Sequence, residues 1–302
     1  MKVFVTGATG YLGSAIAARL VKGGSEVFGL ARTAERAEAL RGLGVKPTLG
    51  DLRQPESFVA ELKNCDAVVH AAIATDNVPR ADQAALEAIR AGVVDGRVRR
   101  VLYTSGVFVH GETGDAIEDE SSPLKPAASV SWRPAHEEVA LDLVEHEAQV
   151  SVMRPGVVYG GAGGILGGWF REARERRIIS YPGDGSQRWN LVHRDDVAEA
   201  YRLALEHARG GQRFLLVDES RHTVRELAEA AARSAGATAH SVPRGQVLEE
   251  LGDYGAALLM DQRMTAAKAR RELGWVPRHA SFITEADDLY REWVAGDEAT
   301  VV

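Results

Sequence analysis

The sequence predicts an α/β fold built on a doubly wound parallel sheet, with a smaller C-terminal region. Short β-rich runs alternate with helical runs through the first 160 residues, which is typical of a parallel sheet covered by helices on both faces. A glycine-rich turn leads directly from the first strand into the first helix. After Tyr159, closely spaced glycines break the pattern, so we expect a second region to begin there.

Each element is expected from its apolar periodicity and from the residues at its ends. Strands are predicted at residues 3–6, 26–30, 67–70, 100–105, 150–154 and 213–217. Helices are predicted at residues 14–22, 34–43, 81–91, 134–147, 197–206, 223–235 and 265–273. Gly274 is expected to end the last of these helices, and Asp195 and Asp196 to favour the start of the helix at 197–206.

Composition and charge predict a soluble protein of a reducing cytoplasm. The single cysteine, Cys65, cannot form an internal disulfide, and its spacing from the histidines is not that of a zinc site, so we expect no metal. No long apolar segment follows Met1, which argues against a signal peptide and a membrane span. The net charge of −7 argues against nucleic acid as a partner. The one basic run, residues 171–177, has the spacing of a solvated helix face with internal ion pairs.

The turn after the first strand has the composition of a phosphate-binding loop. Glycines at positions 7, 10 and 13 allow a tight turn, a close approach of the backbone to a pyrophosphate, and close packing of a helix whose N-terminus faces the anion. An ordinary glycine-rich turn is the alternative. We expect a Rossmann-type domain in which the dinucleotide contacts Gly7, Thr9, Gly10, Tyr11, Leu12 and Gly13.

The end of the second strand favours NADP over NAD. Rossmann domains that bind NAD often end this strand with a carboxylate that accepts hydrogen bonds from the adenosine ribose. Here the chain runs Val-Phe-Gly-Leu-Ala-Arg over residues 27–32, with no carboxylate. Arg32, helped by Arg36, would instead bind a ribose 2′-phosphate. The alternative is a surface arginine that merely opens a helix.

Further motifs follow along nearly the whole chain. They are Gly-Asp-Leu at 50–52, His-Ala-Ala at 70–72, Tyr-Thr-Ser at 103–105, Arg-Pro-Gly-Val-Val-Tyr-Gly at 154–160, Gly-Asp-Gly-Ser-Gln-Arg at 183–188, His-Arg-Asp-Asp-Val-Ala at 193–198 and Glu-Leu-Gly-Trp-Val-Pro at 272–277. In this order the chain resembles an extended short-chain dehydrogenase/reductase of the NAD-dependent epimerase/dehydratase group. We expect residues 1–160 with about 188–218 to form the NAD(P)-binding domain, and about 161–187 with 219–302 to bind substrate.

The resemblance implies roles for further residues. Asp51 and Leu52 would border the adenine, although Asp51 is also a residue that caps turns. Ala71 and Ala72 would border the central part of the cofactor, or simply allow close packing. The nicotinamide amide would meet the segment Pro155, Gly156 and Val157.

The chain departs from the family in its active-site pair. The family usually carries a Ser or Thr on the fifth strand and a Tyr-x-x-x-Lys pair on the next helix. Ser105 matches the first, but Trp132 and His136 occupy the positions of the pair. Indole donates hydrogen bonds but does not exchange protons, so Trp132 could orient a substrate oxygen without acting as an acid.

His136 is the candidate for proton transfer, because imidazole titrates near neutral pH. It would replace the missing acid together with Ser105, or it would only fill the lysine's space and bond the nicotinamide ribose. His110, five residues after Ser105, is expected to border the substrate. Arg188 would face a diphosphate if the substrate were a nucleotide sugar; a salt bridge to a neighbouring loop is the alternative.

The leading functional hypothesis is an NADP(H)-dependent oxidoreductase that acts on a carbonyl, alcohol or imine of a small metabolite. Two other enzyme hypotheses are a nucleotide-sugar epimerase or dehydratase, and a non-redox isomerase or lyase that uses His136. A sensor that binds NADP(H) without hydride transfer is the alternative from another class, because the usual Tyr and Lys are both absent. A homodimer is expected if the apolar stripe of the helix at 134–147 packs against a second copy, although the sheet of a monomer would need the same stripe.

Overall fold

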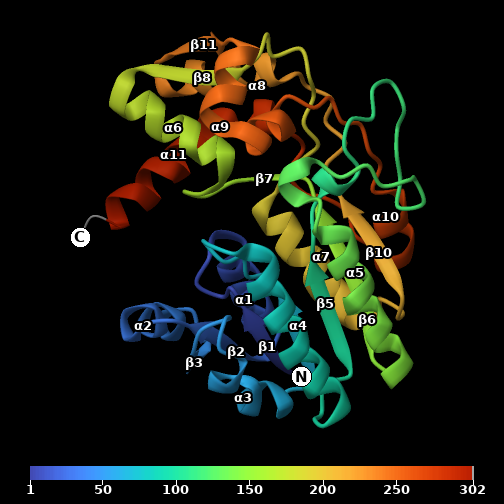
Figure 1. Cartoon of the computed structure of the whole chain (residues 1–302). Helices are drawn as coiled ribbons and strands as arrows, with labels where there is room; N and C mark the ends of the chain where they lie inside the picture. Colours follow the sequence, from blue (N-terminus) through green and yellow to red (C-terminus); the bar gives the residue numbers. More distant parts are fainter. Residues whose placement is uncertain (301–302) are drawn as a thin grey trace.

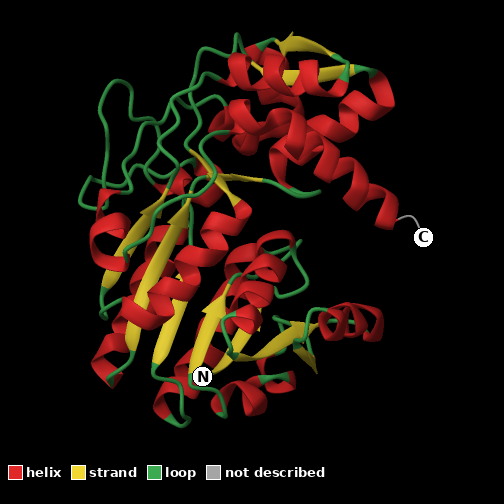
Figure 2. Ribbon diagram, turned by 180° about the vertical axis from the view of Figure 1, so that it is seen from behind, coloured by secondary structure: helices red, strands yellow, loops and turns green. Residues whose placement is uncertain are grey.

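The larger part of the molecule is a seven-stranded parallel sheet between two layers of helices (Figure 1 and Figure 2). This computed structural model describes the backbone of residues 1–300 and the side chains of residues 1–296. The strand order is β10-β6-β5-β4-β1-β2-β3, so the doubly wound sheet predicted from the sequence is confirmed. The seven strands are β1 (Lys2–Thr6), β2 (Glu26–Ala31), β3 (Lys46–Leu49), β4 (Ala67–His70), β5 (Arg100–Thr104), β6 (Gln149–Pro155) and β10 (Gln212–Leu216).

Apolar stripes on seven helices pack against the two faces of the sheet. One face is covered by α1 (Tyr11–Lys22), α2 (Ala34–Gly42), α7 (Arg194–His207) and α10 (Ala267–Leu273). The other is covered by α3 (Val59–Lys63), α4 (Val78–Val94) and α5 (Arg133–Leu141). The helix predicted at 134–147 is shorter than expected, because α5 ends at Leu141. A 3₁₀ segment, Asp142–His146, continues it.

The two-residue period of the strands decides which side chains meet which helix layer. Val3 and Val5 pack on the side of α1, whereas Phe4 between them packs on the side of α4. By the same alternation, His70 at the end of β4 and Tyr103 near the end of β5 face α4 and α5. Polar side chains of two helices and two strands are thereby brought together behind the strand ends.

A smaller region lies beyond the C-terminal ends of the strands, above the sheet in Figure 1. Its elements are α6 (Gly164–Arg176), β8 (Ile178–Pro182), α8 (Val224–Ala235), β11 (Thr238–Val242), α9 (Arg244–Leu258) and α11 (Phe282–Thr300). β8 pairs in parallel with β11, and the short strands β7 (Val157–Tyr159) and β9 (Leu191–His193) pair where the chain passes between the regions. Its core combines aliphatic residues with a group of buried aromatic side chains, Trp169, Phe170, Trp189, Phe282 and Trp293.

The structure differs from the predicted division of the chain at residues 264–275. We expected all of 219–302 to belong to the smaller region, but α10 and Trp275 pack against α7 and the sheet. The buried indole of Trp275 donates a 2.8 Å hydrogen bond to the carbonyl oxygen of Asp196. The Asp196 carboxylate in turn accepts from the backbone of Arg278 and His279. Asp196 thus anchors the returning chain to the start of α7.

The glycine-rich segment after Tyr159 contains a helix start that the sequence did not predict. α6 begins at Gly164, whose φ is +76°, and its last turn contains much of the basic run. Arg176 forms an ion pair with Glu172 there, as expected for a solvated face. Among the described residues, no helix is both long and apolar enough to cross a bilayer.

Candidate functional site

The turn between β1 and α1 is a tight backbone loop in which two positions have no room for a side chain. Gly7 has a φ of +72°, and a Cβ there would lie 2.6 Å from the carbonyl oxygen of Ala71. A Cβ on Gly13 would lie 2.1 Å from the carbonyl oxygen of Gly7. α1 begins with Gly10 as its N-cap, with no side-chain cap and no acidic residue in its first turn. Its first amides therefore suit an anion.

A cavity of about 480 Å³ opens at the C-terminal ends of the strands, beside this turn. Eleven of the residues predicted to bind the cofactor line it: Gly7, Thr9, Gly10, Tyr11, Leu12, Gly13, Arg32, Asp51, Leu52, Ala71 and Ala72. They come from the ends of four neighbouring strands, the usual place for a ligand in such a sheet. The residues present thus fit a dinucleotide.

Three arginines line the same cavity near the ends of β2 and β3. Arg32 and Arg36 were considered from the sequence, whereas Arg53 was not. Arg53 donates to both carboxylate oxygens of Asp51, at 3.0 and 2.7 Å, and also reaches Asp76 at 3.3 Å. Hydrogen bonds from Arg53 lower the pKa of Asp51 to about 2, against the opposing effect of burial. Sequence motifs identified Asp51 but not the cation that holds it.

Tyr11 links the turn to the smaller region. Its hydroxyl donates a 2.7 Å hydrogen bond to the carbonyl oxygen of Gly160, and its ring packs where side chains on Gly163 or Gly164 would lie. Burial raises the pKa of Tyr11 above its usual range, so the phenol stays neutral. Tyr11 therefore lines the cavity and also connects it to the glycine-rich segment.

His136 takes part in a buried network behind the cavity, centred on Asp82 of α4. The Asp82 carboxylate bonds His136 Nδ1 at 2.7 Å, the Tyr103 hydroxyl at 2.8 Å and His70 Nε2 at 3.0 Å. Thr6 Oγ1 lies 2.7 Å from the other nitrogen of His70. Nothing in the sequence marks Asp82 as a site residue, because an aspartate within a helix carries no sign of the contacts it makes.

The start of α5 supplies an arginine that the sequence analysis missed. Arg133 lines the cavity, stacks over the indole of Trp132 and donates a 2.9 Å hydrogen bond to the carbonyl oxygen of Thr104. The Trp132 ring also meets the His136 ring edge to face, with centroids 4.9 Å apart. The sequence did contain a signal for Arg133, because this cation directly follows Trp132, one of the two residues expected in the active site.

The remaining active-site predictions fall beside the cavity wall, not in it. Thr104 lines the cavity, whereas Ser105, Trp132, His136 and residues 155–157 do not. Ser105 is buried, and its Oγ has no hydrogen-bond partner among the described residues. Most buried polar groups in proteins have a hydrogen-bond partner. The backbone amides of Gly156 and Val157 bond Leu216 and Asn190, which fixes this segment to β10 and to the chain before β9.

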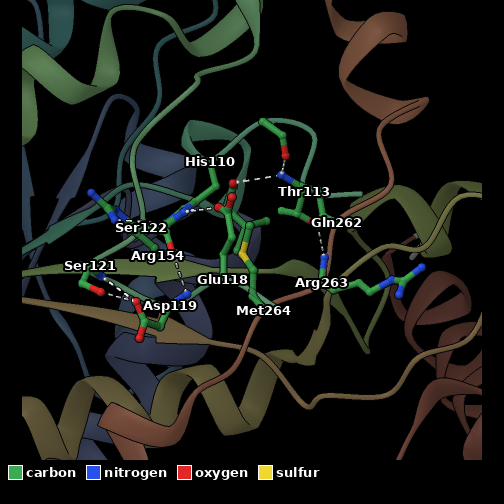
Figure 3. A network of polar contacts seen from close by, with 12 residues as sticks. His110, Thr113, Glu118, Asp119, Ser121, Ser122, Arg154, Gln262, Arg263 and Met264 are labelled. Atoms are coloured by element: carbon green, nitrogen blue, oxygen red, sulfur yellow. Dashed lines mark hydrogen bonds and ion pairs between the residues drawn. The ribbon is translucent and has the colours of Figure 1, made fainter. Parts of the chain in front are cut away.

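His110 does not line the cavity. It is fully buried, with Nδ1 3.0 Å from a carboxylate oxygen of Glu118 and Nε2 3.1 Å from Nη1 of Arg154 (Figure 3). Burial, with the charge of Arg154, lowers the pKa of His110 to about 4. Arg154 also donates to both carboxylate oxygens of Glu137. Since both ring nitrogens are engaged, His110 acts as a structural link.

Arg188 is engaged in the alternative contact that the sequence analysis considered. Its backbone amide donates to Asp261 at 2.7 Å, and its guanidinium lies 3.3 Å from the same carboxylate. Arg188 therefore connects the 183–188 loop to the segment just before Met264. Met264 itself forms an isolated β-bridge with Glu118. A diphosphate would have to compete with Asp261 for this guanidinium.

One group of potential metal ligands lies apart from the cavity. His193, Asp195 and His279 have ligand atoms within 4.8 Å of one another. The two imidazole rings are stacked, with centroids 3.5 Å apart and planes 21° from parallel. Nitrogen lone pairs lie in the ring planes, so rings stacked in this way do not direct both lone pairs at one ion. The structure gives this group no metal-binding geometry.

Similarity to known proteins identifies a family for this chain. A sequence profile of the NAD dependent epimerase/dehydratase family matches residues 3–216. An uncharacterised protein of Schizosaccharomyces pombe is 30% identical over 301 residues, covering 96% of this chain and 100% of the relative. A 4-hydroxy-2-methyl-3-oxo-4-farnesyl-3,4-dihydroquinoline-1-oxide ketoreductase of Stigmatella aurantiaca is 29% identical over 310 residues, covering 92% of each chain.

Solved structures share the whole fold. The dTDP-glucose 4,6-dehydratase of Streptomyces venezuelae, solved with NAD, superposes with a TM-score of 0.85 at 22% identity, over 99% of this chain and 98% of the other. The UDP-glucose 4-epimerase of Bifidobacterium longum, in complex with NAD⁺ and UDP, gives 0.83 at 17% identity, over 99% of each chain. The chain belongs to the NAD-dependent epimerase/dehydratase family, with the fold of the extended short-chain dehydrogenases/reductases.

Proposed function

We propose that this protein is an NADP(H)-dependent oxidoreductase that acts on a carbonyl, alcohol or imine group of a small metabolite. The observation that carries the proposal is the cavity wall, which combines the glycine-rich turn with Arg32 and Arg36. The N-terminal amides of α1 suit a pyrophosphate. Guanidinium groups beside the end of β2 suit a ribose 2′-phosphate, which they bind through charge-assisted hydrogen bonds.

His136 is the proposed proton donor and acceptor. Trp132 and His136 occupy the positions where the family usually carries Tyr and Lys, and of the two only the imidazole exchanges protons near neutral pH. When bound, the nicotinamide supplies or takes up the hydride. His136 exchanges the accompanying proton with the substrate oxygen, while the Ser105 hydroxyl donates a hydrogen bond to that oxygen.

Two measurements test the proposal. Calorimetry with NADPH and NADH is expected to give a dissociation constant about tenfold lower for NADPH, because a 2′-phosphate adds hydrogen bonds to charged groups. Absorbance at the nicotinamide band is then followed while aldehydes, ketones and imines are screened, and oxidation of NADPH by one of these classes is expected. The proposal would be overturned if the protein bound neither NADPH nor NADH.

The other functions considered from the sequence are outcomes of the same screen. Tight NADPH binding without oxidation by any compound would identify a sensor. A nucleotide-sugar epimerase or dehydratase has weaker support, because Asp261 already pairs with Arg188. Conversion of a compound without change at the nicotinamide band would identify a non-redox isomerase or lyase.

A further inference from the structure

The carboxylate of Asp82 is buried between two strands and two helices. Its side chain is 6% exposed, and it lies among His70 of β4, Tyr103 of β5 and His136 of α5. Burial raises the pKa of the carboxyl, but the hydrogen bonds and charge of His70 and the bonds from His136 and Tyr103 together lower it to about 2. Asp82 is therefore ionised at neutral pH.

The contacts of this carboxylate define where the imidazole hydrogens lie. An ionised carboxylate only accepts hydrogen bonds, so His136 Nδ1 and His70 Nε2 must both carry hydrogens. Thr6 Oγ1 lies 2.7 Å from Nδ1, the other ring nitrogen of His70. His136 Nε2 has no hydrogen-bond partner among the residues whose side chains are described, and the His136 side chain is 13% exposed. Nε2 is thus the nitrogen that is available for proton exchange.

We infer that Asp82 is the positioning residue of the proton donor: it holds the His136 imidazole with Nδ1 protonated and Nε2 available, and it stabilises the imidazolium that delivers the proton. The inference rests on the proposed function. An Asp–His pair would in this way replace the missing Tyr–Lys pair, with the carboxylate in the orienting role.

The proton and electron balance of the step is simple. In carbonyl reduction, the Nε2–H bond of the imidazolium breaks and its proton goes to the substrate oxygen. That oxygen receives the electron pair of the carbonyl π bond as hydride from the reduced dinucleotide reaches the carbon. The imidazole is left neutral with its Nδ1 hydrogen still donated to Asp82, and water returns a proton to Nε2.

Among the groups around His136, Asp82 supplies the negative charge that contacts the imidazole. Tyr103 faces the pair from β5, and burial with the charge of Asp82 raises its pKa above the usual range, so it stays a neutral donor. Arg133 and Glu137 lie on α5 beside His136, and Glu137 is already paired with Arg154. His70 from β4 bonds the other oxygen of Asp82.

The first test uses the cofactor-free protein and ¹⁵N NMR of its imidazoles at about pH 9, where histidine is neutral. In the wild-type protein, His136 is expected in the Nδ1–H form. Asp82→Asn presents an amide that can donate, so the Nε2–H form is expected to gain population. Asp95→Asn is the matched control at the C-terminal end of α4, where the side chain is 63% exposed and bonds Lys63; its His136 signals are expected to match wild type.

The second test is kinetic and uses a carbonyl substrate found in the screen. Asp82→Asn is expected to lower kcat about 10²–10³-fold, with the KM for NADPH within about threefold of wild type, because a positioned acid contributes on this scale. Tyr103→Phe removes another donor from the same carboxylate oxygen but leaves the His136 bond, so its kcat is expected within about threefold of wild type.

The outcomes separate this inference from the proposed function. An Nε2–H form of His136 in the wild-type protein overturns the inference even if Asp82→Asn does not fold. Equal losses of kcat in Asp82→Asn and Tyr103→Phe would show a purely structural network and also overturn it. An Asp82-dependent tautomer in a protein that reduces no carbonyl compound would overturn the proposed function and support the positioning of His136 by Asp82.

Discussion

The guanidinium group of Arg133 lies over the indole ring of Trp132, 4.6 Å from the ring centroid. The guanidinium also donates a hydrogen bond through Nη1 to the carbonyl oxygen of Thr104. These contacts hold a positive charge in the cavity wall, in a helix that lacks the lysine usual in the family. Arg133 is therefore expected to contribute to the binding of an anionic dinucleotide.

We predict that Arg133→Gln raises the dissociation constant for NADPH about tenfold, because a hydrogen bond to a charged group is lost. The effect should shrink at high salt, since Arg133 is only half-buried and its charge is partly screened. Calorimetry at two salt concentrations measures both. Arg171→Gln, an exposed arginine on α6, is the control and should bind as wild type does. Equal affinity of Arg133→Gln and wild type would contradict the assignment.

Arg32 is expected to distinguish the two dinucleotides. Arg32→Ala should weaken NADPH binding about 10–100-fold and change NADH binding less than about threefold, because only NADPH carries the 2′-phosphate. The ratio of the two dissociation constants is the measurement. Arg41→Ala is the matched control, because Arg41 lies in the last turn of α2 and pairs with Glu38, away from the cavity wall. Parallel weakening of both dinucleotides would contradict a role in 2′-phosphate recognition.

The buried pair of Arg154 and Glu137 is expected to dominate the local stability of α5 against β6. Both side chains are at most 1% exposed. Glu137→Gln leaves the buried guanidinium without its counter-charge, and should lower the free energy of unfolding by about 3–5 kcal/mol. Urea denaturation measures the change. Glu138→Gln, at a side chain 60% exposed, should cost less than about 1 kcal/mol; a similar loss in both variants would count against the buried pair.

Asp218 is expected to make stability depend on pH. Burial raises its pKa from 3.8 to about 6, partly opposed by Ser220, and its Oδ2 has no partner among the described residues. A folded-state pKa above the unfolded value means that this stability is fully present below about pH 4 and is lost as the pH rises through about 6. Asp218→Asn should therefore be more stable than wild type above about pH 6, by about 1–2 kcal/mol after allowance for partial exposure.

Urea denaturation of wild type and Asp218→Asn between about pH 4 and 8 checks this prediction. The difference in the free energy of unfolding should grow across the interval from about pH 4 to 6 and then stay constant. Asp95→Asn, at an exposed aspartate, should show no such change. A constant difference between Asp218→Asn and wild type over the whole range would contradict the raised pKa.

Much of the fold and of the cofactor cavity could be predicted from the sequence. The turn at Gly7, the strand at 67–70 and the arginine after β2 can each be recognised from the nearby residues and from the strand and helix periods. Parallel strands bring their C-terminal ends to one edge of the sheet. Residues such as Arg32, Asp51 and Ala71 could therefore be assigned to one cavity although they are far apart in the sequence.

Three contacts of candidate site residues were decided only by the tertiary structure. Asp82 meets His136 across 54 residues, Arg154 meets His110 across 44, and Arg188 meets Asp261 across 73. Each contact depends on which face of a helix or strand meets which neighbour, and on how loops of the second region return to the sheet. By itself the sequence predicted the doubly wound parallel sheet and the glycine-rich turn after its first strand. The tertiary structure decided which charges surround His136, because a side chain's partners are selected by packing between distant elements and not by its neighbours along the chain.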